Sequence, residues 1–554
     1  MATQTCARMR ILGAHGCAQS IRRQRVVDRN RVLTGRGSAL PVAPAGLVVL
    51  SALTLLQVLA PPAPAAVRRP LTVRGWILLH YDMEYLREAI AAAPSFDINH
   101  IQLSHGIVHH GEQLIEDQRR QHDVAELARL CHDRGIEIFI WVHELNAVPD
   151  EFKTDGRPDL DRAGFWEWMA RKYDRLFDAG PTIDGIVVSL SEGQYHVYSE
   201  SRVGSKLSPA ERVTKLLEVM SDVCRRRGKK IYCRTFGESP FARQGIFAAP
   251  PDVFVMSKVT NGDWQPYSPH NIATGYFRGS RPEIVEFDLA GEYMGHGQIP
   301  WCCPNYIQYR LRNAVAKGAS GVVGRIGRDN HHILGTPSEI NLYAFSRLID
   351  DPEADLGSLW RDWVSDKYGT GAVDGVTDAL RRTEEITRRL YWGDHLGDIR
   401  IQQHSSLPSL SYAESHNRTY MYTPPVDVTL YSQPGALDND MERRYDAILP
   451  LCDASLSDLD RAKAALKEDE YARVRDYLER QRECVRIFRA VHAAFIAWVV
   501  YKSDPTPERR AWLEGYLARV DQVADEIERR HPDMWPGNPG RARGFASSIR
   551  KRTK

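Results

Sequence analysis

Three carboxylic acids stand at positions where they could perform acid–base chemistry together. Glu192, Asp263 and Glu292 each follow a predicted β-strand by a few residues, after the fourth, sixth and seventh strands in chain order. Cleavage of a glycosidic bond needs a protonated acid at the leaving oxygen and a carboxylate that activates water or attacks directly. Carboxyl groups on opposite sides of a barrel mouth can supply both roles. The three residues therefore form a candidate catalytic set.

Further polar side chains end or follow the same strands. They are His80, His105, His143, Glu144, Arg234, Glu238, Lys258, Asp288, Arg325, Arg328 and Asp329. Any one of them is equally consistent with a structural role, because the loops that follow barrel strands are in contact with water. The collection as a whole is more telling, since active sites of parallel barrels lie at the C-terminal ends of the strands.

Metal and cofactor chemistry has less support in the sequence. His105, His109 and His110 have i, i+4, i+5 spacing, but no HExxH or aspartate-rich motif accompanies them. The chain also lacks a G-x-S-x-G nucleophile elbow, a P-loop and a dinucleotide-binding fingerprint. We therefore expect no metal and no cofactor.

The elements that would position these residues follow from the alternation of apolar runs and amphipathic stretches. The candidate strands are Val73–His80, Ile98–Ser104, Ile136–His143, Asp184–Leu190, Lys230–Phe236, Asp252–Lys258, Glu283–Leu289 and Gly321–Ile326. Helical stretches lie between them, such as Asp123–Arg134 and Ser208–Arg227, the latter with Ser208 as N-cap and Pro209 at the first helical position. Eight strand–helix repeats predict a (β/α)₈ TIM barrel, whereas an open doubly wound sheet would show a glycine-rich turn after its first strand.

The pattern changes after Asp350. Five further stretches have helical periodicity: Leu356–Lys367, Val376–Tyr391, Met441–Glu468, Tyr471–Tyr501 and Pro507–Arg530. The segment from Gly393 to Asp438 shows no clear period, and a long irregular segment in a compact domain is often functional, here as a cover over the barrel mouth. We expect a targeting segment over residues 1–66, a catalytic barrel over 67–350 and an α-helical C-terminal domain over 351–554.

The N-terminal segment has the composition of an export signal. Ala45–Ala60 is an uncharged apolar run of 16 residues, which is short for a membrane span, and Ala63 and Ala65 follow as small residues for signal peptidase. The sequence therefore predicts a periplasmic or extracellular protein with no integral membrane domain once processed; a retained anchor is the alternative. Beyond residue 66 the chain carries 65 basic and 70 acidic residues, scattered along it, which disfavours nucleic acid as a partner.

The cysteines give no strong signal. Seven of the nine follow residue 66, at irregular spacing that fits neither a dense disulfide framework nor a zinc site. One or two disulfides are possible in an oxidising compartment. The oligomeric state is left open.

At the strand ends the sequence resembles glycoside hydrolase family 67, the α-glucuronidases. The resemblance rests on the run Ser191-Glu192-Gly193-Gln194, on Lys258 followed by Asn261, Gly262 and Asp263, and on Glu286-Phe287-Asp288-Leu289-Ala290-Gly291-Glu292-Tyr293. Arg234 in Tyr232-Cys233-Arg234-Thr235-Phe236 is similar to the family's strand-five arginine. The similarity extends through Asn341–Leu348 and fades after about Tyr368.

This resemblance implies specific roles. Glu192 would be the general acid, with its pKa raised by burial and neighbouring carboxylates, and Asp263 and Glu292 would hold the attacking water of an inverting reaction. Arg234 and Lys258 would grip the carboxylate of a terminal α-linked uronic acid, glucuronate or its 4-O-methyl ether. Further expected substrate contacts are His143, Glu144, Tyr195, Trp264, Tyr293 and Asp329, and Trp141 is a candidate for stacking on a sugar face.

The sequence also departs from the family. No β-rich domain precedes the barrel, and Tyr195-His196 stands where the family has a proline-containing stretch. Two rival hypotheses therefore stay open: a barrel glycosidase that acts on another sugar or with retention of configuration, and a carbohydrate-binding protein without catalysis.

Overall fold

The computed structural model describes residues 71–236, 239–260, 266–328, 331–392, 405–416, 425–433 and 435–554. The targeting segment over 1–66 and the residues Glu238, Asp263, Trp264 and Asp329 lie outside the described residues. All described residues belong to one compact unit of the chain.

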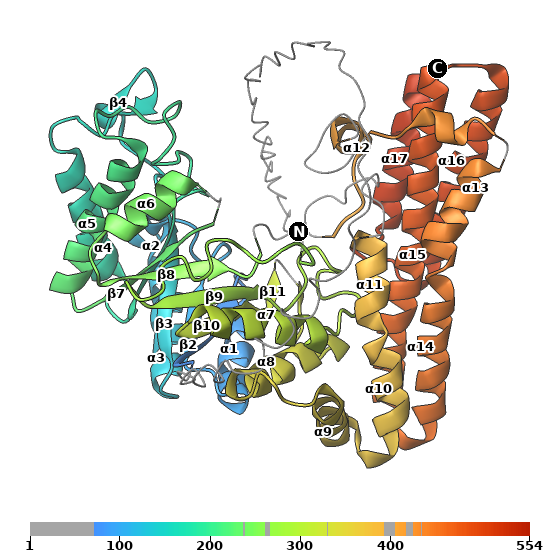
Figure 1. The fold of residues 1–554 in the computed structure, drawn as a ribbon, viewed down its shortest axis with the longest axis horizontal. Coiled ribbons are helices and arrows are strands. Elements are labelled where there is room, and N and C mark those ends of the chain that lie inside the picture. Colours follow the sequence, from blue (N-terminus) through green and yellow to red (C-terminus); the bar gives the residue numbers. More distant parts are fainter. Residues whose placement is uncertain are drawn as a thin grey trace, which may run out of the picture. The chain divides into compact units, whose positions relative to one another are not determined.

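Eight parallel strands close into a barrel in the order β1-β10-β9-β8-β7-β6-β3-β2 (Figure 1). Their bounds are β1 Val73–Leu78, β2 His100–Leu103, β3 Glu137–His143, β6 Gly185–Ser189, β7 Lys230–Arg234, β8 Val253–Lys258, β9 Glu283–Asp288 and β10 Gly321–Arg325. Two small hairpins stand in loops, β4 Lys153–Thr154 with β5 Arg157–Pro158 and β11 Gly327–Arg328 with β12 His331–His332. The predicted (β/α)₈ barrel is confirmed, and each of the eight predicted strands contains an observed one.

Helices surround the barrel and connect its strands. They are α1 Met83–Ala92, α2 Gly111–Glu116, α3 Gln118–His132, α4 Phe165–Ala179, α5 Pro209–Arg226, α6 Pro240–Ala248, α7 Pro304–Lys317 and α8 Ile340–Asp350. Helix α5 begins as predicted, because Ser208 and Glu211 form a reciprocal capping box. Helix α3 begins earlier than predicted, at Gln118, since the Asp117 side chain accepts hydrogen bonds from the first free backbone amides.

The connection from β8 to β9 differs from the expected strand–helix repeat. Its described part, residues 266–282, consists of turns and contains no α-helix. Gly275 and Gly279 have positive φ angles in this stretch, which suits turns and interrupts a helix.

The C-terminal region is helical, as predicted, with different boundaries. Its helices are α9 Leu356–Tyr368, α10 Val373–Arg381, α11 Thr383–Trp392, α12 Leu410–His416, α13 Ala436–Met441, α14 Leu449–Ala462, α15 Glu468–Ser503, α16 Pro507–Arg530 and α17 Pro539–Thr553. The predicted helix over Val376–Tyr391 is two helices separated at Arg382. The predicted helix over Met441–Glu468 is interrupted by a π-turn over Glu442–Asp446, after which Pro450 occupies the first turn of α14, where its missing N–H costs nothing.

The barrel and the C-terminal helices share buried apolar surface. One core cluster runs from the barrel's outer face through α8, α9 and α10 to Leu459 of α14 and Leu478 of α15. Gln481 of α15 also donates hydrogen bonds to the backbone carbonyls of Pro300 and Thr383. The two parts therefore pack as one body.

Helix α15 is the one helix in the described part of the chain that is long and apolar enough to cross a membrane. Its most apolar window is 78% buried against the rest of the protein, as in a core helix. Figure 1 shows α15 beside α14, α16 and α17.

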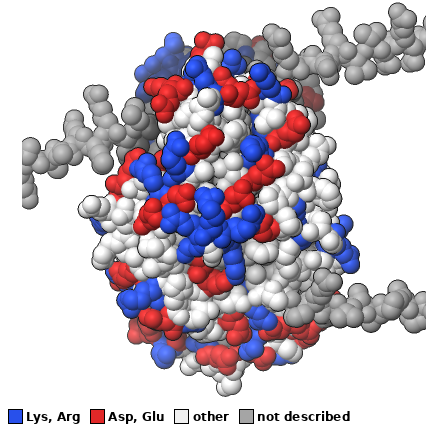
Figure 2. Space-filling view, turned by 90° about the vertical axis from the view of Figure 1, so that its left-hand side faces the viewer, with Lys and Arg blue, Asp and Glu red and all other residues white. Residues whose placement is uncertain are grey.

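The face shown in Figure 2 carries both basic and acidic side chains, with a group of basic ones near its centre and acidic ones around it. On α4 and α5, Arg226 and Arg227 form ion pairs with Asp174, and Arg227 also with Asp178.

The seven cysteines of the described residues are buried free thiols, so the disulfides considered possible are not formed among them. Cys302 and Cys303 are both buried before α7, in a structural position.

Candidate active site

The barrel interior changes from apolar to polar toward the C-terminal ends of its strands. A small apolar cluster fills the middle and includes Trp141, Val187, Tyr232, Met256, Ile284 and Val323. Side chains two residues apart on a strand point to the same face. The next inward positions on those six strands are His143, Ser189, Arg234, Lys258, Glu286 and Arg325, all of them buried.

Four of these side chains belong to a chain of alternating charges at the strand ends, which we call the mouth network. It consists of Glu192, Arg234, Lys258, Glu286, Asp288, Glu292, Arg325 and Arg328. Its centre is Glu286, whose side chain is 1% exposed. Arg234 binds Glu286 at 2.9 Å, and Lys258 and Arg325 lie 3.4 and 3.5 Å from it. The interpretation of the sequence missed Glu286 as a site residue, although a glutamate inside an apolar strand was a signal for it.

The predicted acid, Glu192, lies at one end of this network. Its carboxylate forms an ion pair with Arg234 and accepts a hydrogen bond from Ser189 Oγ at 2.8 Å. Burial by itself would raise the pKa of Glu192, but the charge of Arg234 and the hydrogen bond of His143 outweigh it and hold the pKa well below the usual range. This corrects the expected direction, because Arg234 was predicted to face the substrate and not the acid.

His143 lies beside Glu192. Its Nδ1 donates to the backbone carbonyl of His109, which fixes the orientation of the ring. Its Nε2 lies 3.3 Å from Glu192 Oε2, so the imidazole is in contact with the carboxylate.

The opposite end of the network holds Glu292. Its side chain is 6% exposed and lies 2.6 Å from Arg325 and 3.3 Å from Arg328. Asp288 fixes the backbone there by accepting hydrogen bonds from the amides of Gly291 and Glu292. Ser405, from the irregular segment predicted to cover the mouth, donates to the Glu292 carbonyl at 2.8 Å. That segment therefore does contact the loop that carries Glu292.

The predicted uronate clamp is already engaged within the protein. Arg234 and Lys258 both contact Glu286, and their side chains are 2% and 5% exposed. Arg328 is the most exposed cation of the network, at 22%, and it shares its partner Glu292 with Arg325. A substrate carboxylate would therefore meet Arg328 before it met Arg234 or Lys258.

Glu144 is not placed for substrate contact. Its side chain is fully buried and accepts from Lys172 at 2.6 Å and from Tyr173 at 2.5 Å, both residues of α4. Burial raises the pKa of Glu144, although Lys172 acts in the opposite direction. Glu144 follows His143 directly and so points to the other side of β3, between the barrel and its helices.

The predicted aromatic contacts separate into core and rim. Trp141 is buried in the barrel interior, where its indole donates to Gln102 at 2.7 Å and the Arg234 guanidinium lies 4.0 Å from its ring centre. Tyr293 is 9% exposed. Tyr195 is half-buried, and its hydroxyl donates to the Gly156 carbonyl at 3.1 Å. Of the three predicted aromatic contacts that the structure describes, Tyr195 is therefore the most exposed.

Three histidines gather beside Glu192. One ring nitrogen each of His105, His109 and His143 lies within 4.8 Å of the others, and they are the group within the described ranges that could hold a metal ion. Burial lowers the pKa of His109 to about 4. The nearby charges of His143 and Arg328 also lower this pKa, whereas the charge of Glu192 raises it. His110, the third member of the sequence cluster, turns away and contacts Glu112 at 3.1 Å. The His109 and His143 rings stack, with their centres 4.1 Å apart and their planes at 22° to each other.

The fold and the site define a (β/α)₈ barrel with a buried acid–base network at its strand ends and a helical C-terminal region. Among solved structures, the chain is similar to a GH138 enzyme targeting pectin rhamnogalacturonan II, with 12% sequence identity over 88% of this chain and 84% of that chain, at a TM-score of 0.62. It is also similar to a mutant O-GlcNAc hydrolase of Thermobaculum terrenum, with 13% identity over 87% and 94% of the two chains, at a TM-score of 0.43.

No family model matches the chain, and no curated protein matches it in sequence. At these identities the first likeness establishes the barrel fold, and folds of this kind carry many different activities. The similarity to the α-glucuronidases therefore continues to rest on the motifs around Glu192, Lys258 and Glu292.

Proposed function

We propose that this protein is a glycoside hydrolase that releases a terminal α-linked uronic acid from oligosaccharides derived from polysaccharides. The observation that carries the proposal is the unit of Glu192, His143 and Arg234. Glu192 is 25% exposed, whereas His143 and Arg234 are buried behind it, so one carboxyl group in contact with an imidazole and a guanidinium faces the mouth. This arrangement suits proton transfer to a leaving oxygen.

The two acid–base roles divide between the ends of the mouth network. Glu192 protonates the leaving oxygen, with the His143 ring in contact behind it. Glu292 and Asp263 are the proposed partners of the attacking water, as the family resemblance implies. Arg328 binds the carboxylate of the sugar. It is the most exposed cation of the mouth network, and its partner Glu292 is also neutralised by Arg325.

A second candidate is a barrel glycosidase for a neutral sugar. It is favoured by the contacts of Arg234 and Lys258 with Glu286, since these two cations are neutralised before any substrate binds. Export from the cytoplasm, which follows from the N-terminal composition, is part of the proposal and fits either candidate.

One experiment tests the activity and the sugar together. The protein is incubated with aldouronic acids and with neutral α-linked oligosaccharides of equal length, and the products and their anomeric form are followed by NMR. Glu192→Gln should lower turnover about 10²–10⁴-fold, the usual contribution of a general acid or base. Unchanged turnover in that variant would remove Glu192 from the acid role.

Arg328→Gln separates the two sugars. Loss of a hydrogen bond to a charged group costs about 1.5–3 kcal/mol, so KM for the uronic acid substrate should rise roughly 10- to 100-fold, and by much more than KM for neutral substrates. Release of neutral sugars alone would favour the second candidate.

A further inference from the structure

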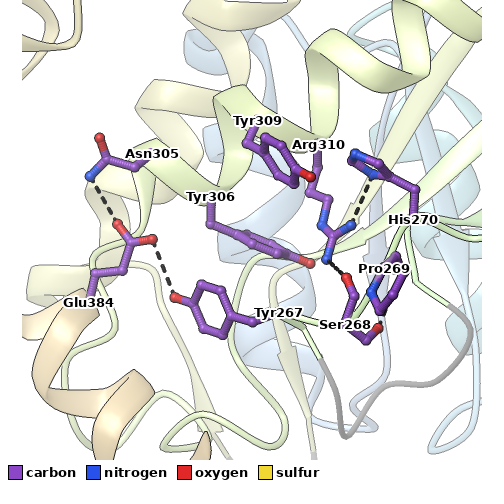
Figure 3. Close-up of a pocket in the computed structure, with 9 residues that line it drawn as sticks. All are labelled: Tyr267, Ser268, Pro269, His270, Asn305, Tyr306, Tyr309, Arg310 and Glu384. Carbon is purple, nitrogen blue, oxygen red and sulfur yellow. Dashed lines mark hydrogen bonds between the residues drawn. The ribbon is translucent and has the colours of Figure 1, made fainter. Parts of the chain in front are cut away.

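A second cavity lies outside the mouth network, on the flank of α7. It has a volume of about 630 Å³, within the range of small-molecule sites. Three segments far apart in the sequence line it: the loop Tyr267–His270, the first half of α7 and the start of α11 (Figure 3). The loop belongs to the β8–β9 connection, whose described part contains no α-helix.

One wall of the cavity is aromatic. The Tyr309 side chain is 57% exposed, and its ring stacks on His270 with centres 4.7 Å apart and planes 26° apart. Tyr306 lies one position after Asn305 on the same helix and packs edge-on against Tyr267 at 5.6 Å. An exposed tyrosine ring above a polar floor is an amphipathic surface, suited to a ligand with one flat apolar face and hydroxyl groups at its edge.

The opposite side of the cavity presents paired polar groups. The Glu384 carboxyl group accepts from the Tyr267 hydroxyl at 3.3 Å and from the Asn305 amide at 3.1 Å (Figure 3). Burial raises the pKa of Glu384 to about 7, against the hydrogen bonds of Asn305 and Tyr267. A hydroxyl group can donate to the carboxylate or accept from the carboxylic acid, so it suits both forms of this residue.

The cation of the cavity is held by the protein itself. Arg310 donates to the backbone carbonyls of Pro266 and Ser268 and contacts His270 Nδ1 at 2.9 Å. These bonds tie the loop to α7, so the walls are fixed before a ligand enters and little conformational entropy is lost on binding. Because the Arg310 guanidinium is engaged in these bonds, the cavity suits a neutral ligand better than an anion.

The cavity adjoins the mouth. Tyr306, which lines the cavity, also lines a small hollow at the strand ends together with Lys258, Glu286 and Arg325. Tyr306 therefore stands between the mouth network and the cavity.

We propose that this cavity binds a neutral sugar unit of the oligosaccharide, through stacking on Tyr309 and hydrogen bonds to Glu384, Asn305 and Tyr267. The proposal rests on the proposed function for the identity of the ligand. It assigns to the cavity the part of the substrate that lies away from the bond to be cleaved.

Direct binding tests the proposal without turnover. Wild-type protein is titrated with xylotetraose, cellotetraose and maltotetraose by calorimetry, with ligand contacts confirmed by saturation-transfer NMR. Tyr309→Ala should raise Kd for at least one tetrasaccharide about tenfold, while Tyr309→Phe, which keeps the ring, should retain the affinity. Tyr276→Ala is the matched control, because Tyr276 is also an exposed tyrosine, at 48%, and lies outside the cavity.

Two results would overturn the assignment: no binding of any of the three tetrasaccharides to wild type, or equal Kd values for wild type and Tyr309→Ala. Failure of the proposed function looks different. If Glu192→Gln leaves turnover unchanged but Tyr309→Ala weakens binding, the cavity assignment stands and the acid assignment falls.

Discussion

Two buried charge networks begin at consecutive residues of this protein and lead to opposite sides of one strand. From His143 the contacts run into the barrel, to Glu192 and on to Arg234. From Glu144 they run outward to Lys172, which also binds Glu112 at 2.7 Å. Successive side chains on a strand face opposite ways, so one network meets the mouth and the other meets α4.

Solvent access is what separates the two networks in function. The inner one ends in a glutamate that is 25% exposed, whereas the side chains of Glu144, Lys172 and Glu112 are 0%, 4% and 13% exposed. A substrate can reach the first and not the second. Similar residue types therefore form the proposed acid–base unit on one side and an anchor for a helix on the other.

The largest expected effect is at the centre of the mouth network. Glu286→Gln leaves Arg234, Lys258 and Arg325 without their shared counter-charge, and breaking a buried ion pair costs about 3–5 kcal/mol. We expect both the free energy of unfolding, measured in urea, and the turnover to fall, since Arg234 also positions Glu192. A variant that loses stability but keeps full turnover would show that the network does not position the acid.

Lys172→Met tests the outer network and should affect stability alone. It leaves Glu144 and Glu112 buried without their cation, at a cost of about 3 kcal/mol. Turnover per folded molecule should match that of wild type at temperatures below the unfolding transition. The double variant Lys172→Met, Glu144→Gln should recover part of the stability, because it removes one stranded charge.

The pH dependence of stability gives the smallest effect and opposite signs for the two networks. The pKa of Glu192 is below its unfolded value, so its pairing with Arg234 stabilises the fold above about pH 4.3 and is lost as the pH falls through the folded pKa. Glu192→Gln should therefore flatten the loss of stability that wild type shows as the pH falls below about 4.3.

Glu144 behaves in the opposite way, because burial raises its pKa. Its contribution is present below the unfolded pKa and is lost as the pH rises through the folded pKa. As the pH rises, the free energy of unfolding of Glu144→Gln should therefore fall less than that of wild type. Equal acid limbs in wild type and Glu192→Gln, measured by urea unfolding at each pH, would contradict the contrast between the networks.

Much of the fold could be predicted from the sequence because its signals are local. Each barrel strand is a short apolar run, and the start of α5 is set by Ser208, Pro209 and Glu211 within one turn. The helix boundaries that were wrong, at Arg382 and around Pro450, lie where packing between helices competes with a continuous helical period.

The candidate site was predictable in part. The strand ends were correctly expected to gather Glu192, Arg234, Lys258 and Glu292, since the C-terminal ends of parallel strands meet at one mouth. Which cation faces which carboxylate could not be predicted. Glu286 forms ion pairs with Arg234 and Lys258, and these pairs depend on distances between strands, not on spacing along the chain.

The sequence by itself determined the barrel, its polar strand ends and a candidate acid in Glu192, because apolar strand runs, helical periods and strand-end positions are local properties of the chain. Only the tertiary structure decided that His143 faces Glu192 while Glu144 holds α4, and that Tyr267, Tyr309 and Glu384 line one cavity. The physical reason is that closure of the barrel and the docking of α11 beside α7 bring together residues separated by dozens of positions, and the charges and rings that then meet set the pKa values and the binding surfaces.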